Sequence, residues 1–399
     1  MSKDVVYLWD SRVSTFNYGD ASQHPMKPLR LQLVHELLNS LGVLDYVRMV
    51  QPPPIPTSAL VTYHTRPYIE FLRSTNCGEA TCAHSRVFQF SSDCPPFEGV
   101  FDFSSGAAAA SVAGAVLINH RKADVAINWC GGLHHAKRME ASGFCYINDI
   151  VLAILELLRV HKRVLYIDID VHHGDGVEEA FYTTERVMTV SFHKGDNFFP
   201  GTGKRDDMGM LGGRGYSLNV PLFDGITDDQ YYYVLFRPLI QSVMQRYQPS
   251  AVVMQCGADS LVGDRIGTFN LSSTCHAQCL QFVRGFGLPM LVLGGGGYTM
   301  SSVARCWAME TALLCNAPVN EHTLVPEHAF STYYTPNARL GIPSEHSRRN
   351  ENSNGYVEKL LGLLMDQLRR VQGPPSVTGE HRETSWVPPP LFDPEVWQT

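Results

Sequence analysis

The feature that most constrains this chain is a run of acids and histidines that directly follows a short apolar segment. Residues 164–167 read Val-Leu-Tyr-Ile, which predicts a buried strand, and the glycines at 174 and 176 end the extended run. The polar groups of the run are Asp168, Asp170, His172, His173 and Asp175. Because open parallel sheets bind ligands at the carboxyl ends of their strands, we expect a ligand site here. This density of ligating groups indicates a metal.

The spacing within the run predicts which side chains face a ligand site and which face the core. Asp168, Asp170 and His172 stand at every second position, so strand periodicity predicts that they share one face. The apolar residues between them are expected to face the core, and His173 is expected to turn away from the polar face. A single aspartate in such a place is more often a helix cap, but the whole cluster favours a metal site.

Composition places the chain among ordinary folded proteins. Its 399 residues are 44% hydrophobic and 18% charged, which argues against a wholly disordered chain. The net charge of -7 gives no support for direct nucleic-acid binding, which needs a basic surface. The ten cysteines include no C-x-x-C pair, so we expect reduced thiols in an intracellular compartment. The Ala-rich stretch 106–118 is shorter than the ~20 apolar residues of a spanning helix, so no membrane segment is expected.

Apolar segments alternate with helical patterns along most of the chain. Further buried strands are predicted at residues 5–8, 125–129, 187–192, 251–255 and 290–293. Such alternation implies right-handed crossovers and a mainly parallel sheet with helices on both faces. We therefore expect a single three-layer α/β/α domain over residues 1–372. The composition of residues 373–399 predicts a disordered C-terminal tail.

Polar residues follow several of these strands. His134 and His135 come after two glycines at a strand end. A lone loop histidine is usually a solvated side chain, but two adjacent histidines in that setting can serve as a base and its electrostatic partner, which is the interpretation we favour. Asp259 and Tyr298 follow two later strands. Because the carboxyl ends of parallel strands meet at one edge of a sheet, these groups are expected to converge there.

Three loops leave weaker signals. Asp93 lies in a proline-stiffened loop, where the residue alone is better explained as a turn initiator than as a ligand-binding group. Phe198 and Phe199 precede Pro-Gly-Thr-Gly and are either a stacked core pair or the wall of a substrate cavity. The glycines of residues 209–215 lack the strand, turn and helix setting of a dinucleotide site, so nucleotide binding is not expected.

Five segments taken together resemble the class I histone deacetylases. They are Leu-His-His-Ala-Lys at 133–137, Asp-Ile-Asp-Val-His-His-Gly-Asp-Gly at 168–176, Phe-Pro-Gly-Thr-Gly at 199–203, Gly-Ala-Asp at 257–259 and Gly-Gly-Gly-Tyr at 295–298. The resemblance spans about residues 5–315. It implies one arginase-like α/β domain with a central parallel sheet, which hydrolyses the amide of Nε-acetyl-lysine with one zinc ion.

The resemblance also implies roles for the residues at the strand ends. The expected metal ligands are Asp170, His172 and Asp259, an oxygen-rich set that suits a catalytic zinc and would also accept Fe(II). The expected catalytic residues are His135 as general base, Asp175 as its orienting partner, His134 with its partner Asp168, and Tyr298 as the oxyanion donor.

Substrate and ion contacts follow from the same resemblance. The expected substrate-binding residues are Asp93, Gly143, Phe144, Phe199 and Ile266. The Asp168 backbone with Ser191 and Phe192 resembles a potassium site of the family. Ser301 stands where inositol-phosphate-binding members carry an arginine, so this regulation is not expected.

The expected partners are acetylated histone tails or other acetyl-lysine proteins, together with a corepressor complex, in the nucleus or the cytoplasm. Three alternatives remain: an acetylpolyamine deacetylase, a longer-acyl deacylase, and a catalytically silent corepressor scaffold. A two-manganese ureohydrolase of the same fold would need acids where this chain has Gly174 and Leu261, so the second metal would lack ligands.

Overall fold

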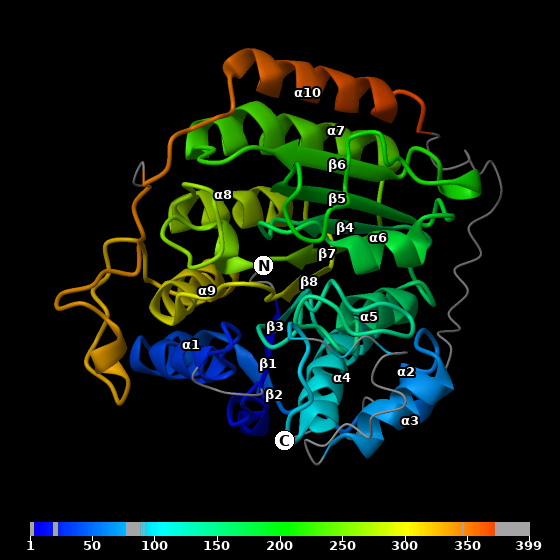
Figure 1. Ribbon diagram of the computed structural model, residues 1–399. Coiled ribbons are helices and arrows are strands. Elements are labelled where there is room, and N and C mark those ends of the chain that lie inside the picture. Colours follow the sequence, from blue (N-terminus) through cyan, green and yellow to red (C-terminus); the bar gives the residue numbers. More distant parts are fainter. Residues whose placement is uncertain are drawn as a thin grey trace.

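A sheet of eight parallel strands organises the part of the chain described by the computed structural model, which comprises residues 4–18, 23–76, 88, 90, 92–344 and 347–371. The strand order is β2-β1-β3-β8-β7-β4-β5-β6 (Figure 1), and every neighbouring pair is parallel. The strands are β1 (Val5–Leu8), β2 (Arg48–Val50), β3 (Val125–Asn128), β4 (Val164–Asp168), β5 (Val187–Lys194), β6 (Ser217–Leu222), β7 (Ala251–Gln255) and β8 (Met290–Leu293). The predicted parallel sheet is confirmed. The end of the predicted domain at 372 and the tail 373–399 lie outside the described residues.

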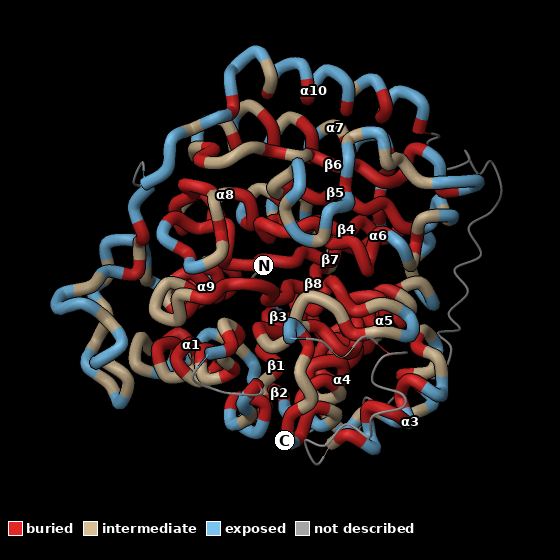
Figure 2. The backbone as a smooth tube through the Cα atoms, in the orientation of Figure 1, coloured by how far each residue is buried: buried red, intermediate tan, exposed pale blue. Residues whose placement is uncertain are grey.

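Alternate residues of a strand enter two different hydrophobic cores. In β1, Val5 and Tyr7 belong to one core, and Val6 and Leu8 belong to the other. This follows from the two-residue period of a strand, which sends successive side chains to opposite faces. Figure 2 shows the buried residues concentrated in the strands and on the helix faces that cover them. The three-layer α/β/α prediction is therefore confirmed.

Helices cover both faces of the sheet. The first core is packed by α1 (Leu29–Ser40), α7 (Arg237–Tyr247), α8 (Ser273–Arg284) and α9 (Met300–Cys315). The second core is packed by α4 (Val100–Asn119), α5 (Asp149–Leu157) and α6 (Asp175–Phe181). The peripheral helices are α2 (Thr57–Leu60), α3 (Arg66–Ser74) and α10 (Asn354–Leu368), of which α10 packs on α7 and on the π-helical segment Asp229–Phe236.

Helix α4 is longer than its Ala-rich sequence suggested. It contains 20 residues and is apolar enough to cross a membrane, but 78% of its most apolar window is buried inside the fold. Its small side chains let it pack closely against α5, β3 and β8. It therefore has the surroundings of a core helix. The eight described cysteines are free thiols, and Cys77 and Cys82 lie outside the described residues.

Candidate active site

The three predicted metal ligands converge beyond the carboxyl ends of β4 and β7. Strand β4 ends at Asp168, so Asp170 and His172 lie on the following loop, and strand alternation is not what brings them together. Asp259 lies on the 3-10 turn Ala258–Ser260 that follows β7. His172 Nδ1 lies 3.0 Å from Asp170 Oδ1 and 3.1 Å from Asp259 Oδ2. All three side chains are buried.

This ligand cluster requires positive charge. Burial opposes an imidazolium, but hydrogen bonds to Asp170 and Asp259 raise the pKa of His172 to about 10. Burial and the neighbouring Asp170 raise the pKa of Asp259 to about 7. A divalent cation would supply the charge that the protein otherwise draws from protons. Two carboxylates and one imidazole, with ligand atoms within 4.8 Å of one another, fit a catalytic metal ion with three protein ligands.

His134 and His135 form a pair of buried imidazoles with different charge. Their ring centroids are 3.9 Å apart. His134 Nδ1 lies 2.7 Å from Asp168 Oδ2, and His135 Nδ1 lies 2.7 Å from Asp175 Oδ1. Burial opposes charge, yet Asp168 and Asp170 raise the pKa of His134 to about 9. Burial and the charge of His134 lower the pKa of His135 to about 3, so His135 is the neutral ring that can accept a proton.

Glycines bring the loop after β8 against the ligand cluster. The backbone N–H of Gly296 donates to Asp170 Oδ2 at 2.8 Å. A Cβ at this position would overlap the Asp259 carboxylate, so only glycine permits the approach. The backbone of this loop therefore holds the ligand that it contacts.

Tyr298 is held at the end of the same loop. Its backbone N–H donates to Asp264 Oδ2 at 2.7 Å, and the buried Arg30 of α1 donates to the carbonyl of Gly297 at 2.7 Å. Burial and the nearby Asp259 raise the pKa of the phenol, which keeps it a neutral hydrogen-bond donor. Its ring packs edge-on against Phe144 with centroids 5.7 Å apart.

A cavity of about 260 Å³ leads to these groups. Its lining residues are Asp93, His135, Gly143, Phe144, His172, Phe198, Phe199, Ile266 and Tyr298. All five predicted substrate-binding residues are therefore brought together. Phe198 joins them: it stacks on the ring of His172 with centroids 5.1 Å apart, so the loop at 198–203 forms a cavity wall rather than a core pair. His173 contacts Thr202 and His193 instead, which agrees with its expected orientation away from the metal face.

Several groups behind the site were not assigned a role from the sequence. Gln255, the last residue of β7, donates to Asp170 Oδ2 at 2.9 Å. Tyr166 donates to Asp168 Oδ2 at 2.6 Å. Asp149 accepts from the backbone N–H groups of Gly132 and Leu133 at 3.0 and 2.8 Å, which orders the histidine loop. The sequence signal for Gln255 and Tyr166 was a polar group within or at the end of an otherwise apolar strand.

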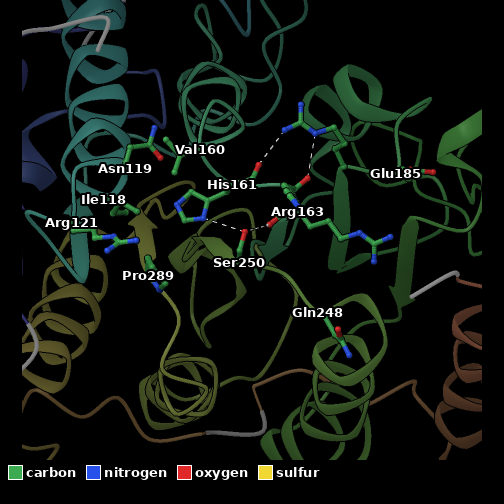
Figure 3. A pocket seen from close by; sticks show the side chains of 12 residues that line it. Ile118, Asn119, Arg121, Val160, His161, Arg163, Glu185, Gln248, Ser250 and Pro289 are labelled. Atoms are coloured by element: carbon green, nitrogen blue, oxygen red, sulfur yellow. Dashed lines mark hydrogen bonds between the residues drawn. The ribbon is translucent and has the colours of Figure 1, made fainter. Parts of the chain in front are cut away.

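A larger cavity, of about 630 Å³, is lined by residues that directly precede β4, β5, β7 and β8 (Figure 3), so it lies at the amino ends of these strands. None of the predicted site residues lines it. Arg186 donates to the carbonyls of Leu158 and His161 at 2.7 and 3.2 Å, and Arg163 donates to the carbonyl of Tyr247 at 2.8 Å. These contacts satisfy carbonyl groups at or just beyond the carboxyl ends of α5 and α7. Arg163 and Arg186 thus have a structural role at this cavity.

Comparison with known proteins agrees with this geometry. Residues 24–314 match the histone deacetylase domain family. The chain is 48% identical over 398 residues to histone deacetylase 19 of Arabidopsis thaliana, covering 99% of this chain and 77% of that protein. It is 49% identical over 378 residues to histone deacetylase 1 of Homo sapiens, covering 94% and 77%. It is 47% identical over 394 residues to type-1 histone deacetylase 1 of Dictyostelium discoideum, covering 98% and 77%.

The chain therefore belongs to the histone deacetylase family. The resemblance to class I members that the motifs indicated is confirmed, and so is the arginase-like α/β fold that it implied.

Proposed function

We propose that this protein hydrolyses the amide bond of Nε-acetyl-lysine in histones and other proteins and releases acetate. The observation that carries the proposal is the convergence of a neutral imidazole, a three-residue metal-ligand cluster and a buried phenol at one narrow cavity. Family membership supports the same reaction.

Asp170, His172 and Asp259 would hold a zinc ion. When bound, zinc polarises the acetyl carbonyl and brings the pKa of a coordinated water toward about 7. The same oxygen-rich ligand set also suits Fe(II). The backbone of Asp168, with Ser191 and Phe192, is proposed to hold a potassium ion as a structural cation.

The residues around this cluster have separate roles in the proton transfers and in stabilising the oxyanion. Asp175 accepts the Nδ1–H of His135, which leaves the Nε2 lone pair to take a proton from the attacking water. His134 carries the charge that its partner Asp168 stabilises, and it supplies a proton to the lysine amine as the C–N bond breaks. Tyr298 donates to the oxygen that becomes negative as the carbonyl carbon turns tetrahedral.

The cavity shape suits an extended alkyl chain. Phe144 and Phe199 would flank the lysine methylenes, Ile266 would add an apolar contact, and the carbonyl of Gly143 would accept from the substrate amide. Asp93 at the rim would hold the backbone of the substrate peptide. We propose acetylated histone tails as the principal substrates and a corepressor complex in the nucleus as the setting, with cytoplasmic acetyl-lysine proteins as further substrates.

The test is a panel of acyl-lysine peptides and acetylpolyamines, assayed for acid release with metal content measured in parallel. We expect acetyl-lysine peptides to be turned over fastest, activity to vanish with a chelator, and zinc to restore it. Faster turnover of acetylpolyamines or longer acyl groups would reassign the substrate. No turnover at all would favour the silent scaffold, and a fully active Asp170→Ala variant would refute the proposed metal ligands.

A further inference from the structure

A chain of buried polar side chains leads from the candidate metal cluster into the layer formed by α8 and α9. It consists of Ser260, His276 and Glu310, which are 0%, 1% and 0% exposed. Ser260 directly follows the candidate ligand Asp259, His276 lies on α8, and Glu310 lies on α9. None of the three lines the substrate cavity. Their roles must therefore be exerted through other residues.

Ser260 joins the two segments that carry the candidate ligands. Its hydroxyl donates to the carbonyl of Ile169 at 2.8 Å, and the carbonyl of Gly257 lies 3.3 Å away. Ile169 immediately precedes Asp170, and Gly257 is two residues before Asp259. The position of this one hydroxyl thus affects the spacing between two ligand-bearing segments.

His276 determines how that hydroxyl is oriented. Its Nε2 lies 2.7 Å from Ser260 Oγ. A serine has one hydrogen to donate, and here it is directed to a carbonyl, which can only accept. The Nε2 of His276 must therefore carry a hydrogen and donate it to the serine oxygen. This fixes the imidazole tautomer and leaves Nδ1 facing α9.

Glu310 stands opposite Nδ1. Its Oε1 lies 3.5 Å from His276 Nδ1, and its carboxyl group also interacts with the thiol of Cys306 on the same helix. Two lone pairs would repel each other there, so one proton must lie between the two groups. Burial raises the pKa of Glu310, which favours the acid as a carrier of that proton.

We infer that His276 and Glu310 are positioning residues that orient the Ser260 hydroxyl and so hold the segments of Asp170 and Asp259 at the spacing that the metal requires. The inference rests on the proposed function, because it places the metal at these ligands. Mutation of residues that orient metal ligands typically lowers metal affinity by about 10- to 100-fold.

The test measures zinc affinity by competition with a chromophoric chelator, using the full chain. His276→Leu removes the donor to Ser260, and we expect zinc affinity to fall about 10- to 100-fold. His276→Gln keeps an amide N–H that can reach the same oxygen, and it should restore most of the affinity. Rescue by the glutamine separates hydrogen bonding from simple loss of packing.

Glu156 provides a matched control for the second residue. It is also a buried glutamate of a helix, 2% exposed, with a pKa raised by burial, but it contacts Asn119, which lines the larger cavity, and Arg159. We expect Glu310→Leu to weaken zinc binding and Glu156→Leu to leave it unchanged. Melting temperatures of the metal-free proteins are measured alongside, so that loss of stability is not mistaken for loss of affinity.

Four results would overturn the inference, the last of them together with the proposed metal site. The first is wild-type zinc affinity in His276→Leu. The second is equal weakening by Glu310→Leu and Glu156→Leu. The third is evidence for a second metal site, because His276, Cys306 and Glu310 lie close enough to hold a metal ion themselves. Two zinc equivalents per wild-type chain, falling to one in Glu310→Gln, would assign that role. A wild-type protein that binds no zinc would refute the proposed metal site along with the inference.

Discussion

Tyr298 is the residue whose role in the proposed reaction can be tested with the least structural change. The variant Tyr298→Phe keeps the ring that packs against Phe144 and removes only the hydroxyl. Loss of one donor to a developing oxyanion typically lowers kcat by about 100- to 1000-fold. We expect that loss in steady-state assays with an acetyl-lysine peptide, with KM changed far less. Near wild-type kcat would show that the phenol is not the donor.

Most residues of the candidate site could be predicted from the sequence because they occur in compact motifs. Asp170 and His172 lie two positions apart, and the two adjacent histidines follow glycines at a strand end. Gln255 and Asp149 were not assigned because their importance depends on what the fold places opposite them. An aspartate at a helix start reads as a cap, and only the structure shows that Asn148 caps α5 while Asp149 reaches the histidine loop.

At the scale of elements, the start of α5 holds the histidine loop in place. The carboxylate of Asp149 accepts from two backbone N–H groups of that loop and from the hydroxyl of Ser111. In Asp149→Ala these buried donors lose their partner, which costs about 1–3 kcal/mol for each. We expect a lower midpoint in urea unfolding together with reduced activity, since His134 and His135 follow directly. Unchanged stability with reduced activity would contradict this explanation.

The same helix start gives a pH dependence. His64 Nε2 accepts from the backbone N–H of Asn148 at 3.0 Å, and burial lowers the pKa of His64 to about 4. Between that value and the unfolded pKa of about 6.5, the unfolded chain binds an additional proton, so stability falls as pH drops through this window. The full effect is on the order of 3 kcal/mol.

The variant His64→Gln isolates this contribution. Its amide oxygen can accept from Asn148 but cannot take up a proton in this range. As the pH is lowered from about 6.5 to 4, we expect the free energy of unfolding to fall less steeply in the variant than in the wild type. The difference between the two slopes should correspond to at most one bound proton. Parallel slopes in the two proteins would show that the buried imidazole does not contribute.

At the scale of the whole molecule, the predicted domain end at residue 372 can be tested by truncation. Helix α10 buries Val357, Leu360, Leu364 and Leu368. A chain of residues 1–372 is expected to keep the melting temperature and the activity of the full chain. A chain of residues 1–350 lacks α10, exposes the apolar surface beneath it and should melt at a lower temperature. Loss of activity in the 1–372 chain would place the boundary further on.

Local patterns predicted the layers and six of the eight strands, but not β2, β6 or the strand order. The two-residue and helical periods are properties of short segments, whereas the position of β8 beside β3 depends on pairing between segments more than a hundred residues apart. For the same reason the sequence located the polar strand ends but not the contacts between them.

That position of β8 has a consequence for the growing chain. Strands β2, β1 and β3 form one part of the sheet, β7, β4, β5 and β6 form another, and β8 alone pairs with both. His134 and His135 follow the first part, whereas the three candidate ligands belong to the second. Until residue 293 has been synthesised, the proton-transfer groups and the metal ligands have no common sheet to hold them together. Pairing of β8 with both parts is therefore required before the two sets of groups share one sheet.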